Sequence, residues 1–248
     1  WMQNGTQMYK KNPKVAQAAV KNMRLINTFV GGVYHGVVWD KSEIKTYVDL
    51  KGKRVFTGPP AGGAAITAEG MVRAVAGYNP KKDYNAVRLP WGSGLQAMQD
   101  GKLDVFIRPA GLGAATINQL GVKRKFRLLD VGDARHSEAW KKYQGPTGRV
   151  TVKIPAGTYS NQANNTKDIF TNGFMSQIVV RKGLPDDLVY KLTKTMFDNI
   201  KEMHESAVTL KLVGLDDPFN AGNVPLHPGA LRFYKEVGKT IPKSLLGG

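Results

Sequence analysis

The chain of 248 residues contains no cysteine. Disulfides and cysteine-based zinc or iron–sulfur sites are therefore excluded, which suits an exported bacterial protein as well as many cytosolic ones. Long hydrophobic runs are missing too, since none approaches the roughly 18 apolar residues of a membrane-spanning helix. A signal peptide is also absent, because Trp1 follows neither a charged nor an apolar segment. The sequence thus predicts a soluble chain that is cytosolic, processed or truncated.

Acidic residues are scarce: 19 stand against 36 lysines and arginines, which gives a formal net charge of +17. Such an excess favours nucleic acid, anionic lipid or an acidic ligand as a partner. The basic residues are scattered, however, and only Lys51-Gly52-Lys53-Arg54 and residues 123–125 form tight clusters. No RNP-type motif, zinc finger or basic-helix pattern accompanies them, so we expect no nucleic-acid partner.

Catalytic patterns are missing as well. The four histidines lie far apart and none belongs to an H-E-x-x-H pattern, so we expect each to be a surface or structural residue. They are His35, His136, His204 and His227. There is no G-x-S-x-G elbow, and residues 58–63 form neither a Walker A loop nor a G-x-G-x-x-G match. The sequence predicts no enzyme, no cofactor and no metal site.

What the chain does contain is an alternation of strands and helices. Strand patterns cover 53–57, 86–89, 103–107 and 126–131, and helix patterns cover 66–77, 94–100 and 114–120. This β-α-β alternation is typical of an α/β fold with a mainly parallel sheet. Before it, residues 25–39 read as a strand that Gly31-Gly32 interrupts. The opening, residues 1–10, is polar and rich in turn formers.

The second half of the chain continues with a helix at 133–143, a strand at 150–154 and a β-rich stretch at 174–181. A long amphipathic helix is expected from Pro185 through Met203, and a last helix from His227 through Val237. The stretches 25–39 and 174–181 flank the α/β block. They predict a discontinuous lobe 1 (1–42 plus 160–248) around an inserted lobe 2 (43–159), with ligands in a cleft between the lobes.

The strand-to-helix junction at residues 58–67 is the first candidate ligand site. Glycines let the backbone approach a ligand closely, and free N–H groups at a helix start favour an anion. The predicted ligand-binding residues here are Ala61, Gly62, Gly63, Ala64, Ala65 and Thr67. The same junction is also compatible with nothing more than a tight turn.

Further candidates follow other predicted strands, where ligands bind in α/β sheets. Arg108 and Pro109 follow the strand at 103–107, and Trp91 follows the strand at 86–89. Arg108 is suited to a bidentate carboxylate contact, although a solvated surface arginine fits equally well. Trp91 and Tyr159 are interpreted either as cleft walls or as core, and Asn172 completes the predicted set.

Several ordered segments resemble the TAXI family of TRAP-transporter substrate-binding proteins. They are Asp49-Leu50-Lys51-Gly52-Lys53-Arg54-Val55, Asp100-Gly101-Lys102-Leu103-Asp104-Val105-Phe106, Ile154-Pro155-Ala156-Gly157-Thr158-Tyr159 and Pro225-Leu226-His227-Pro228-Gly229-Ala230-Leu231-Arg232-Phe233-Tyr234. The first occurs in many type II periplasmic binding proteins, whereas the whole set is more specific. The resemblance covers the chain from about Leu25 onward.

This resemblance implies a two-lobe, Venus-flytrap fold of type II, with a mixed sheet flanked by helices in each lobe. It implies a monomeric periplasmic receptor that closes over a small organic anion, usually a carboxylate such as glutamate or 2-oxoglutarate. The receptor then delivers the solute to a TRAP-type membrane permease, in transient contact at the membrane surface. By the same resemblance, the loop at 61–67 lies at the ligand.

The sequence departs from the family in two places. The family's initial strand, small-residue loop and helix are missing, because the chain starts at the segment that matches Asn4-Gly5. The family's ligand loop also carries P-G-S-G and polar residues, where this chain has Pro60-Ala61-Gly62-Gly63-Ala64-Ala65. The lost hydroxyl and the two small apolar side chains facing the site predict a bulkier or more apolar ligand than glutamate.

Two other functional classes share this fold. One is the effector-binding domain of a transcriptional regulator, which would need an N-terminal helix-turn-helix. The other is a transferase of the porphobilinogen-deaminase or phosphoribosyl type. The lack of cysteine and of an acidic cluster at the cleft loops disfavours the transferase, and the C-terminal segment disfavours the regulator.

Overall fold

The computed structural model describes residues 11–122, 124–145 and 148–247. The expected polar opening (1–10), with Asn4-Gly5, and Lys123 of the second basic cluster lie outside these ranges. Contacts between Cα atoms divide the chain into two compact units: unit 1 is Trp1–Val30 with Met175–Gly248, and unit 2 is Gly31–Phe174. The expected lobe boundaries at 42/43 and 159/160 both fall inside unit 2. No described helix is long and apolar enough to cross a bilayer.

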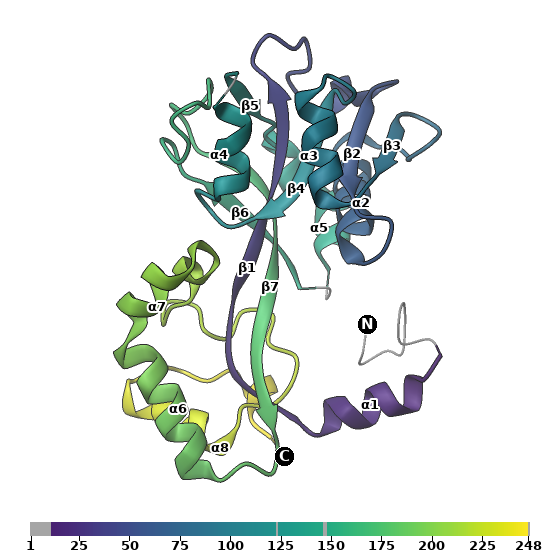
Figure 1. Cartoon of the computed structure of the whole chain (residues 1–248). Coiled ribbons are helices and arrows are strands. Elements are labelled where there is room, and N and C mark those ends of the chain that lie inside the picture. Colours follow the sequence, from purple (N-terminus) through teal and green to yellow (C-terminus); the bar gives the residue numbers. More distant parts are fainter. Residues whose placement is uncertain (1–10, 123, 146–147, 248) are drawn as a thin grey trace. The chain divides into compact units, whose positions relative to one another are not determined.

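The strands join in one mixed sheet, in the order β3-β2-β4-β1-β7-β6, with β5 beside β1 (Figure 1). They are β1 (Met23–Trp39), β2 (Arg54–Gly58), β3 (Asn85–Arg88), β4 (Val105–Ala110), β5 (Phe126–Leu128), β6 (Arg149–Ile154) and β7 (Ile169–Arg181). Only β3 and β4 run parallel to β2, whereas β1 is antiparallel to β4 and β5, and β6 is antiparallel to β7. The sheet is mixed, as the resemblance implies. The parallel arrangement expected from the β-α-β alternation holds for β2, β3 and β4, whereas β1, β5 and β6 form antiparallel pairs.

The helices of unit 2 cover both faces of its sheet. They are α2 (Gly63–Ala76), α3 (Trp91–Gln99), α4 (Ala115–Gly121) and α5 (Glu138–Gln144), with 3₁₀ turns η2 (Tyr47–Leu50) and η3 (Gly132–His136). On one face α2 buries Met71 and Val72 in a core that also holds Val55 and Val105. Successive strand residues point to opposite faces, so Phe56 lies on the other face. There Gly94 of α3 lies so close to the Phe56 ring that a Cβ atom would overlap it.

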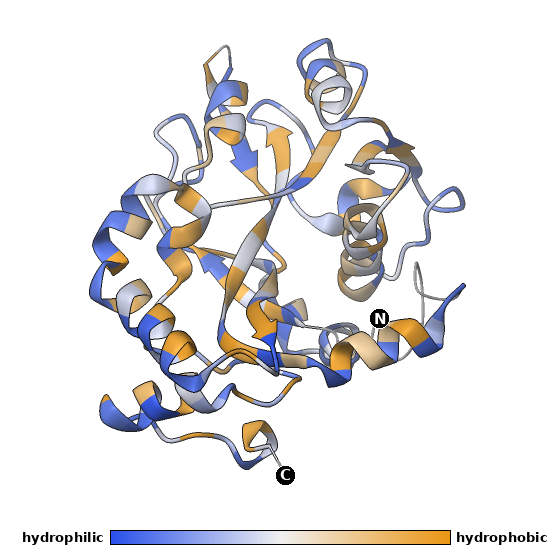
Figure 2. Ribbon diagram, turned by 60° about the horizontal axis from the view of Figure 1, so that its bottom comes forward, coloured by the Kyte–Doolittle hydropathy of each residue, from blue (hydrophilic) through white to orange (hydrophobic). Residues whose placement is uncertain are grey.

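In its described residues, unit 1 takes the first part of β1, the last part of β7 and six short helices. They are α1 (Pro13–Lys21), α6 (Asp186–Asp198), α7 (Ile200–Ser206), η4 (Val208–Leu212), α8 (Pro228–Glu236) and η5 (Lys243–Leu245). The core joins Leu25 and Ile26 to Phe233 and Tyr234. At Gly229 a Cβ atom would collide with backbone atoms of α6, so glycine allows the close packing of α8 on α6. Figure 2 shows hydrophobic and hydrophilic residues on the same helices, as amphipathic helices require.

The structure corrects several of the expected boundaries of helices and strands. The strand at 25–39 is not interrupted at Gly31-Gly32: β1 is continuous, and Gly32 makes room for the ring of Phe174. The helix expected from 66 already begins at Gly63, and the one expected from 94 begins at Trp91. Ser137 divides the helix expected at 133–143 into η3 and α5, since its hydroxyl caps the second of them. The long helix expected through Met203 is likewise two helices, α6 and α7, separated by Asn199.

Candidate functional site

The carboxyl ends of β2, β3 and β4 lie at one edge of the sheet, because β2 runs parallel to both neighbours. The loop between β2 and α2 is exposed at Ala61 and Gly62. Gly62 caps α2 with φ 94°, a left-handed conformation that favours glycine, and no side chain caps the helix. The first N–H groups of α2 therefore have no side-chain acceptor, which makes this helix start suitable for an anion.

Two tyrosines hold the first turns of α2 in place. The Tyr34 hydroxyl donates to the carbonyl oxygen of Ala64 at 3.3 Å, and the Tyr143 hydroxyl donates to that of Thr67 at 2.9 Å. Thr67 itself is buried. Ala65 is 1% exposed, so its methyl group packs inward and, contrary to the expectation, does not face the loop. Ala64 is half-buried. The two hydrogen bonds thus fix the backbone of the helix start, and the loop offers a ligand backbone N–H groups but few polar side chains.

Arg108 supplies the charge at this edge. It lies within β4, half-buried, and its guanidinium carbon is 4.8 Å from the centroid of the Trp91 ring. Its Nε has no exposed surface and no hydrogen-bond partner, and no carboxylate among the described residues forms an ion pair with it. Burial lowers the pKa of the Arg108 guanidinium, because desolvation disfavours the charged form. The site therefore holds an uncompensated, partly desolvated cation.

Trp91 owes its position to a stack of aromatic rings. It is the first residue of α3, and its ring meets Phe56 edge-on at 5.8 Å. Phe56 in turn stacks on Phe106 at 4.8 Å with an interplanar angle of 9°. The stack fixes the indole on the same face as Arg108, because Phe106 and Arg108 are two residues apart on β4.

Behind Arg108, a buried chain of hydrogen bonds fixes the loop that follows β4. His35 of β1 lies opposite Arg108, and its Nδ1 donates to the carbonyl of Val33 at 2.8 Å. Its Nε2 therefore accepts from the Tyr159 hydroxyl at 2.8 Å, and the Tyr159 oxygen accepts from the N–H of Gly113 at 3.1 Å. Burial lowers the pKa of His35 to about 4, so the ring is neutral.

The predicted ligand-binding residues thus form one group around Arg108 and a second group at the start of α2, while Asn172 lies apart from both. Trp91 and Arg108 touch each other, and Tyr159 reaches Arg108's neighbour His35 with a ring that is fully buried. Pro109 lies opposite Tyr34, which holds the start of α2.

Asn172 lies on β7 opposite Thr151 and is fully buried, with both carboxamide atoms unpartnered. No hydrogen bond within the described ranges joins its side chain to Arg108, Trp91 or the α2 start. Its place in the predicted set stays a prediction.

Sequence reasoning missed the ion pair that fastens α2 to the strand ends. Glu69, 8% exposed, accepts from Arg88 at 2.7 and 2.9 Å and from the Thr57 hydroxyl at 3.0 Å. The two charged partners lie 19 positions apart, so no local sequence pattern predicted that they would pair. His35 was expected to be a surface or structural histidine, and it is a structural one. In the described part of the chain no three His, Asp or Glu residues gather as a metal site would require.

Fold and site together define a class: an α/β protein of two compact units, with an exposed helix start and a free cation at the carboxyl edge of parallel strands. The chain matches the model of the NMT1-like family over residues 2–238 and belongs to that family.

Solved structures of binding proteins give weaker likenesses. The aliphatic sulphonate binding protein SsuA of Escherichia coli is 14% identical, with 90% of this chain and 62% of that chain covered and a TM-score of 0.41. The putative sulfonate-binding protein SsuA of Methylobacillus flagellatus is 13% identical, with 91% and 65% covered and a TM-score of 0.44. The arginine-, lysine-, histidine-binding protein ArtJ of Geobacillus stearothermophilus is 12% identical, with 81% and 68% covered and a TM-score of 0.42. The chain thus spans less than two thirds of the length of the two sulfonate-binding proteins.

Proposed function

We propose that this protein is a solute receptor for a membrane transporter and binds a small organic anion, a carboxylate, at the carboxyl edge of β2 and β4. The observation that carries the proposal is Arg108, a cation that has no acidic partner among the described residues and rests on the Trp91 ring. A guanidinium offers two parallel N–H donors to a carboxylate. Membership in the NMT1-like family and the named solute-binding proteins above agree with this class.

The receptor acts in the periplasm as a monomer and meets its permease in transient contact at the membrane surface. We assign it to a TRAP-type transporter of the TAXI kind on the ordered sequence segments alone. The loop chemistry adds the ligand class: the hydroxyl of the family's loop is lost, Ala61 and Ala64 are small and apolar, and the half-buried Trp91 offers an aromatic wall. The ligand is therefore bulkier or more apolar than glutamate.

The first experiment identifies the solute. The purified protein is denatured, and any ligand retained from the expression host is identified by mass spectrometry. In parallel, a thermal-shift screen compares glutamate with larger and aromatic carboxylic acids. Stabilisation by the larger acids is the expected result. Stabilisation by glutamate but by no larger acid would contradict the ligand class, and turnover of a candidate substrate would instead support an enzyme.

The role of Arg108 is tested by calorimetric titration of the best acid from that screen. Arg108→Gln removes a charge-assisted contact, so the Kd should rise about tenfold or more. Arg232→Gln is the matched control, because Arg232 also lies over an aromatic ring, that of Tyr190 at 4.0 Å, but belongs to unit 1. An unchanged Kd for Arg108→Gln would overturn the assignment of the site.

A further inference from the structure

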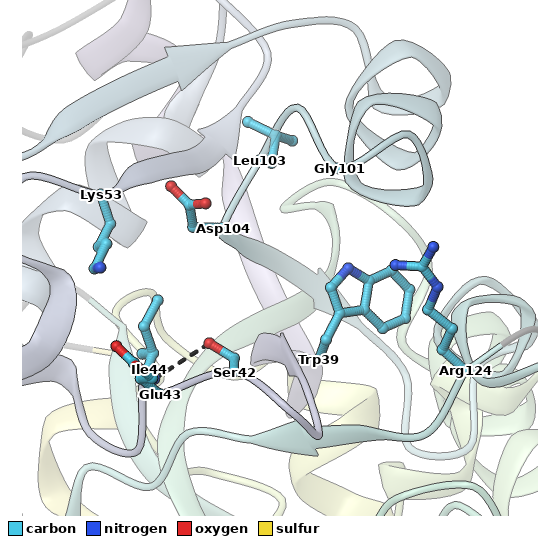
Figure 3. A pocket seen from close by; sticks show the side chains of 9 residues that line it. All are labelled: Trp39, Ser42, Glu43, Ile44, Lys53, Gly101, Leu103, Asp104 and Arg124. Atoms are coloured by element: carbon cyan, nitrogen blue, oxygen red, sulfur yellow. Dashed lines mark hydrogen bonds between the residues drawn. The ribbon is translucent and has the colours of Figure 1, made fainter.

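Unit 2 carries a hollow of about 240 Å³ at the end of β1, shown in Figure 3. Six of the side chains that line it have polar groups: Trp39, Ser42, Glu43, Lys53, Asp104 and Arg124. A second hollow of about 500 Å³ adjoins it, because it shares Trp39 and Arg124 and adds Asp40, Lys41 and Lys125. None of the residues assigned to the Arg108 site lines either hollow.

The donors of the first hollow are unused. The indole nitrogen of Trp39 is buried and has no hydrogen-bond partner in the part of the chain that the structure describes, which is costly for a group that can only donate. The Ser42 oxygen accepts from the N–H of Ile44 at 3.2 Å, so its own hydrogen is free to be donated. The Arg124 guanidinium lies over the Trp39 ring at 5.5 Å, and neither it nor Lys53 forms an ion pair with a described carboxylate.

The acidic groups of the hollow differ in how they are compensated. Both oxygens of Asp104 accept hydrogen bonds from Arg54, at 2.7 to 3.1 Å, so the charge of this carboxylate is neutralised from outside the hollow. Glu43 is exposed and has no such partner within the described ranges. Two cations without a close ion pair among the described residues, Lys53 and Arg124, therefore line the hollow beside one carboxylate without such a pair, that of Glu43. The excess of positive charge around the hollow favours an anionic ligand.

We propose that the Trp39 hollow is a second binding site, one that takes a single carboxylate group. The Trp39 N–H, the Ser42 hydroxyl and the Lys53 ammonium donate to the carboxylate oxygens, and Arg124 moves from the indole face onto the bound group. A cation is disfavoured, because Lys53 and Arg124 repel it and the indole N–H offers it no lone pair. A doubly charged phosphate is disfavoured by Glu43. The carboxylate belongs either to a free acid or to an acidic side chain of a partner protein.

The indole N–H signals in a ¹H–¹⁵N NMR spectrum of the ¹⁵N-labelled protein report on this site directly. Trp39→Phe identifies the Trp39 signal by its loss and removes the donor while keeping an aromatic ring. The probes are sodium acetate, inorganic phosphate and a capped peptide of four glutamates, each titrated at constant ionic strength. We expect acetate or the peptide to move the Trp39 signal to saturation, and phosphate to bind more weakly.

Two substitutions that remove charges of opposite sign, and that should change the affinity in opposite directions, make the test specific. Lys53→Gln removes a charge-assisted donor and should weaken binding about tenfold. Glu43→Gln removes a like charge and should tighten binding. Lys167→Gln is the control for a general change in protein charge, since Lys167 is exposed and lines neither hollow, and should leave the Kd unchanged.

The outcomes show whether the carboxylate comes from a free acid or from a partner protein, and whether the site binds a carboxylate at all. Tighter binding of the peptide than of acetate, at equal carboxylate concentration, assigns the site to a protein partner, and equal binding assigns it to a free acid. The proposal is overturned by a Trp39 signal that no carboxylate moves, by tighter binding of phosphate, or by weaker binding in Glu43→Gln. The Arg108 site plays no part in any of these results.

Discussion

Burial holds His35 in its neutral form, and this selects the direction of two hydrogen bonds. The carbonyl of Val33 can only accept, so the ring proton sits on Nδ1 and the Nε2 lone pair receives the Tyr159 hydroxyl. Protonation of Nε2 would place two hydrogens between the imidazole and the tyrosine oxygen, unless the hydroxyl turned away. The loop after β4, held through Gly113, therefore depends on a neutral imidazole.

This arrangement predicts a loss of stability in mild acid. The pKa of His35 is about 4 in the folded protein, against about 6.5 in an unfolded chain. Between these values the unfolded state binds the extra proton, so the free energy of unfolding falls as the pH drops from 6.5 to 4. The loss from this residue is about 3 kcal/mol at most. Urea denaturation at a series of pH values measures it, and a constant stability across that window would contradict the prediction.

Single residues also show where sequence reasoning stops. Arg108 and Trp91 could be singled out because each follows a strand pattern, and strand ends of an α/β sheet meet at one edge. The part played by Tyr159 could not be foreseen. Its hydroxyl depends on His35, which lies 124 positions away in the chain. No spacing rule connects residues that only the completed sheet brings together.

Among the elements, α2 is attached to the strand ends by an ion pair in addition to its core packing and the two tyrosine hydrogen bonds. The carboxylate of Glu69 is 8% exposed, whereas the side chain of Arg88 is 41% exposed. Removal of the arginine leaves a buried carboxylate with the Thr57 hydroxyl but no charged partner, and removal of the carboxylate leaves an arginine that water can reach. The two halves of the pair are therefore not equivalent.

We expect Arg88→Ala to lower the free energy of unfolding by about 3 kcal/mol or more, because the Glu69 carboxylate stays buried. Glu69→Gln should cost about 1–2 kcal/mol, since the amide keeps the shape and a hydrogen bond. Lys141→Ala is the control: its pair with Glu138 has the same 2.7 Å separation but is exposed, so its loss should cost below about 1 kcal/mol. Urea denaturation compares the three, and equal costs would contradict the argument from burial.

Element types follow from the sequence more closely than element boundaries. Alternating apolar runs predicted the strands and helices of unit 2, and Gly77 ends α2 in a left-handed conformation, φ 75°, as its position in the pattern indicates. Gly31-Gly32 indicated an interruption because glycine is unfavourable in a strand. The strand continues because the Phe174 ring fills the space above Gly32, a contact that the local sequence does not encode.

For the whole molecule, the net charge of +17 predicts a salt-dependent attraction to anionic membranes. We expect the protein to sediment with vesicles of phosphatidylcholine and phosphatidylglycerol at 20 mM NaCl. It should be released near 500 mM, where charges are screened within about 4 Å. Vesicles of phosphatidylcholine alone are the control and should not bind. Binding that persists at high salt would show an apolar contact in place of the expected electrostatic one.

The division of the chain into units also has a consequence for biosynthesis. Unit 2 is one continuous segment, Gly31–Phe174, so all of its residues have been made once residue 174 is added. Unit 1 combines the two ends of the chain, and its Leu25 and Ile26 pack against Phe233 and Tyr234. A chain made from its N-terminus therefore has these apolar side chains waiting for partners that the ribosome supplies some 200 residues later. A chaperone that binds the nascent chain therefore has to cover the beginning of β1 for longer than any segment of unit 2.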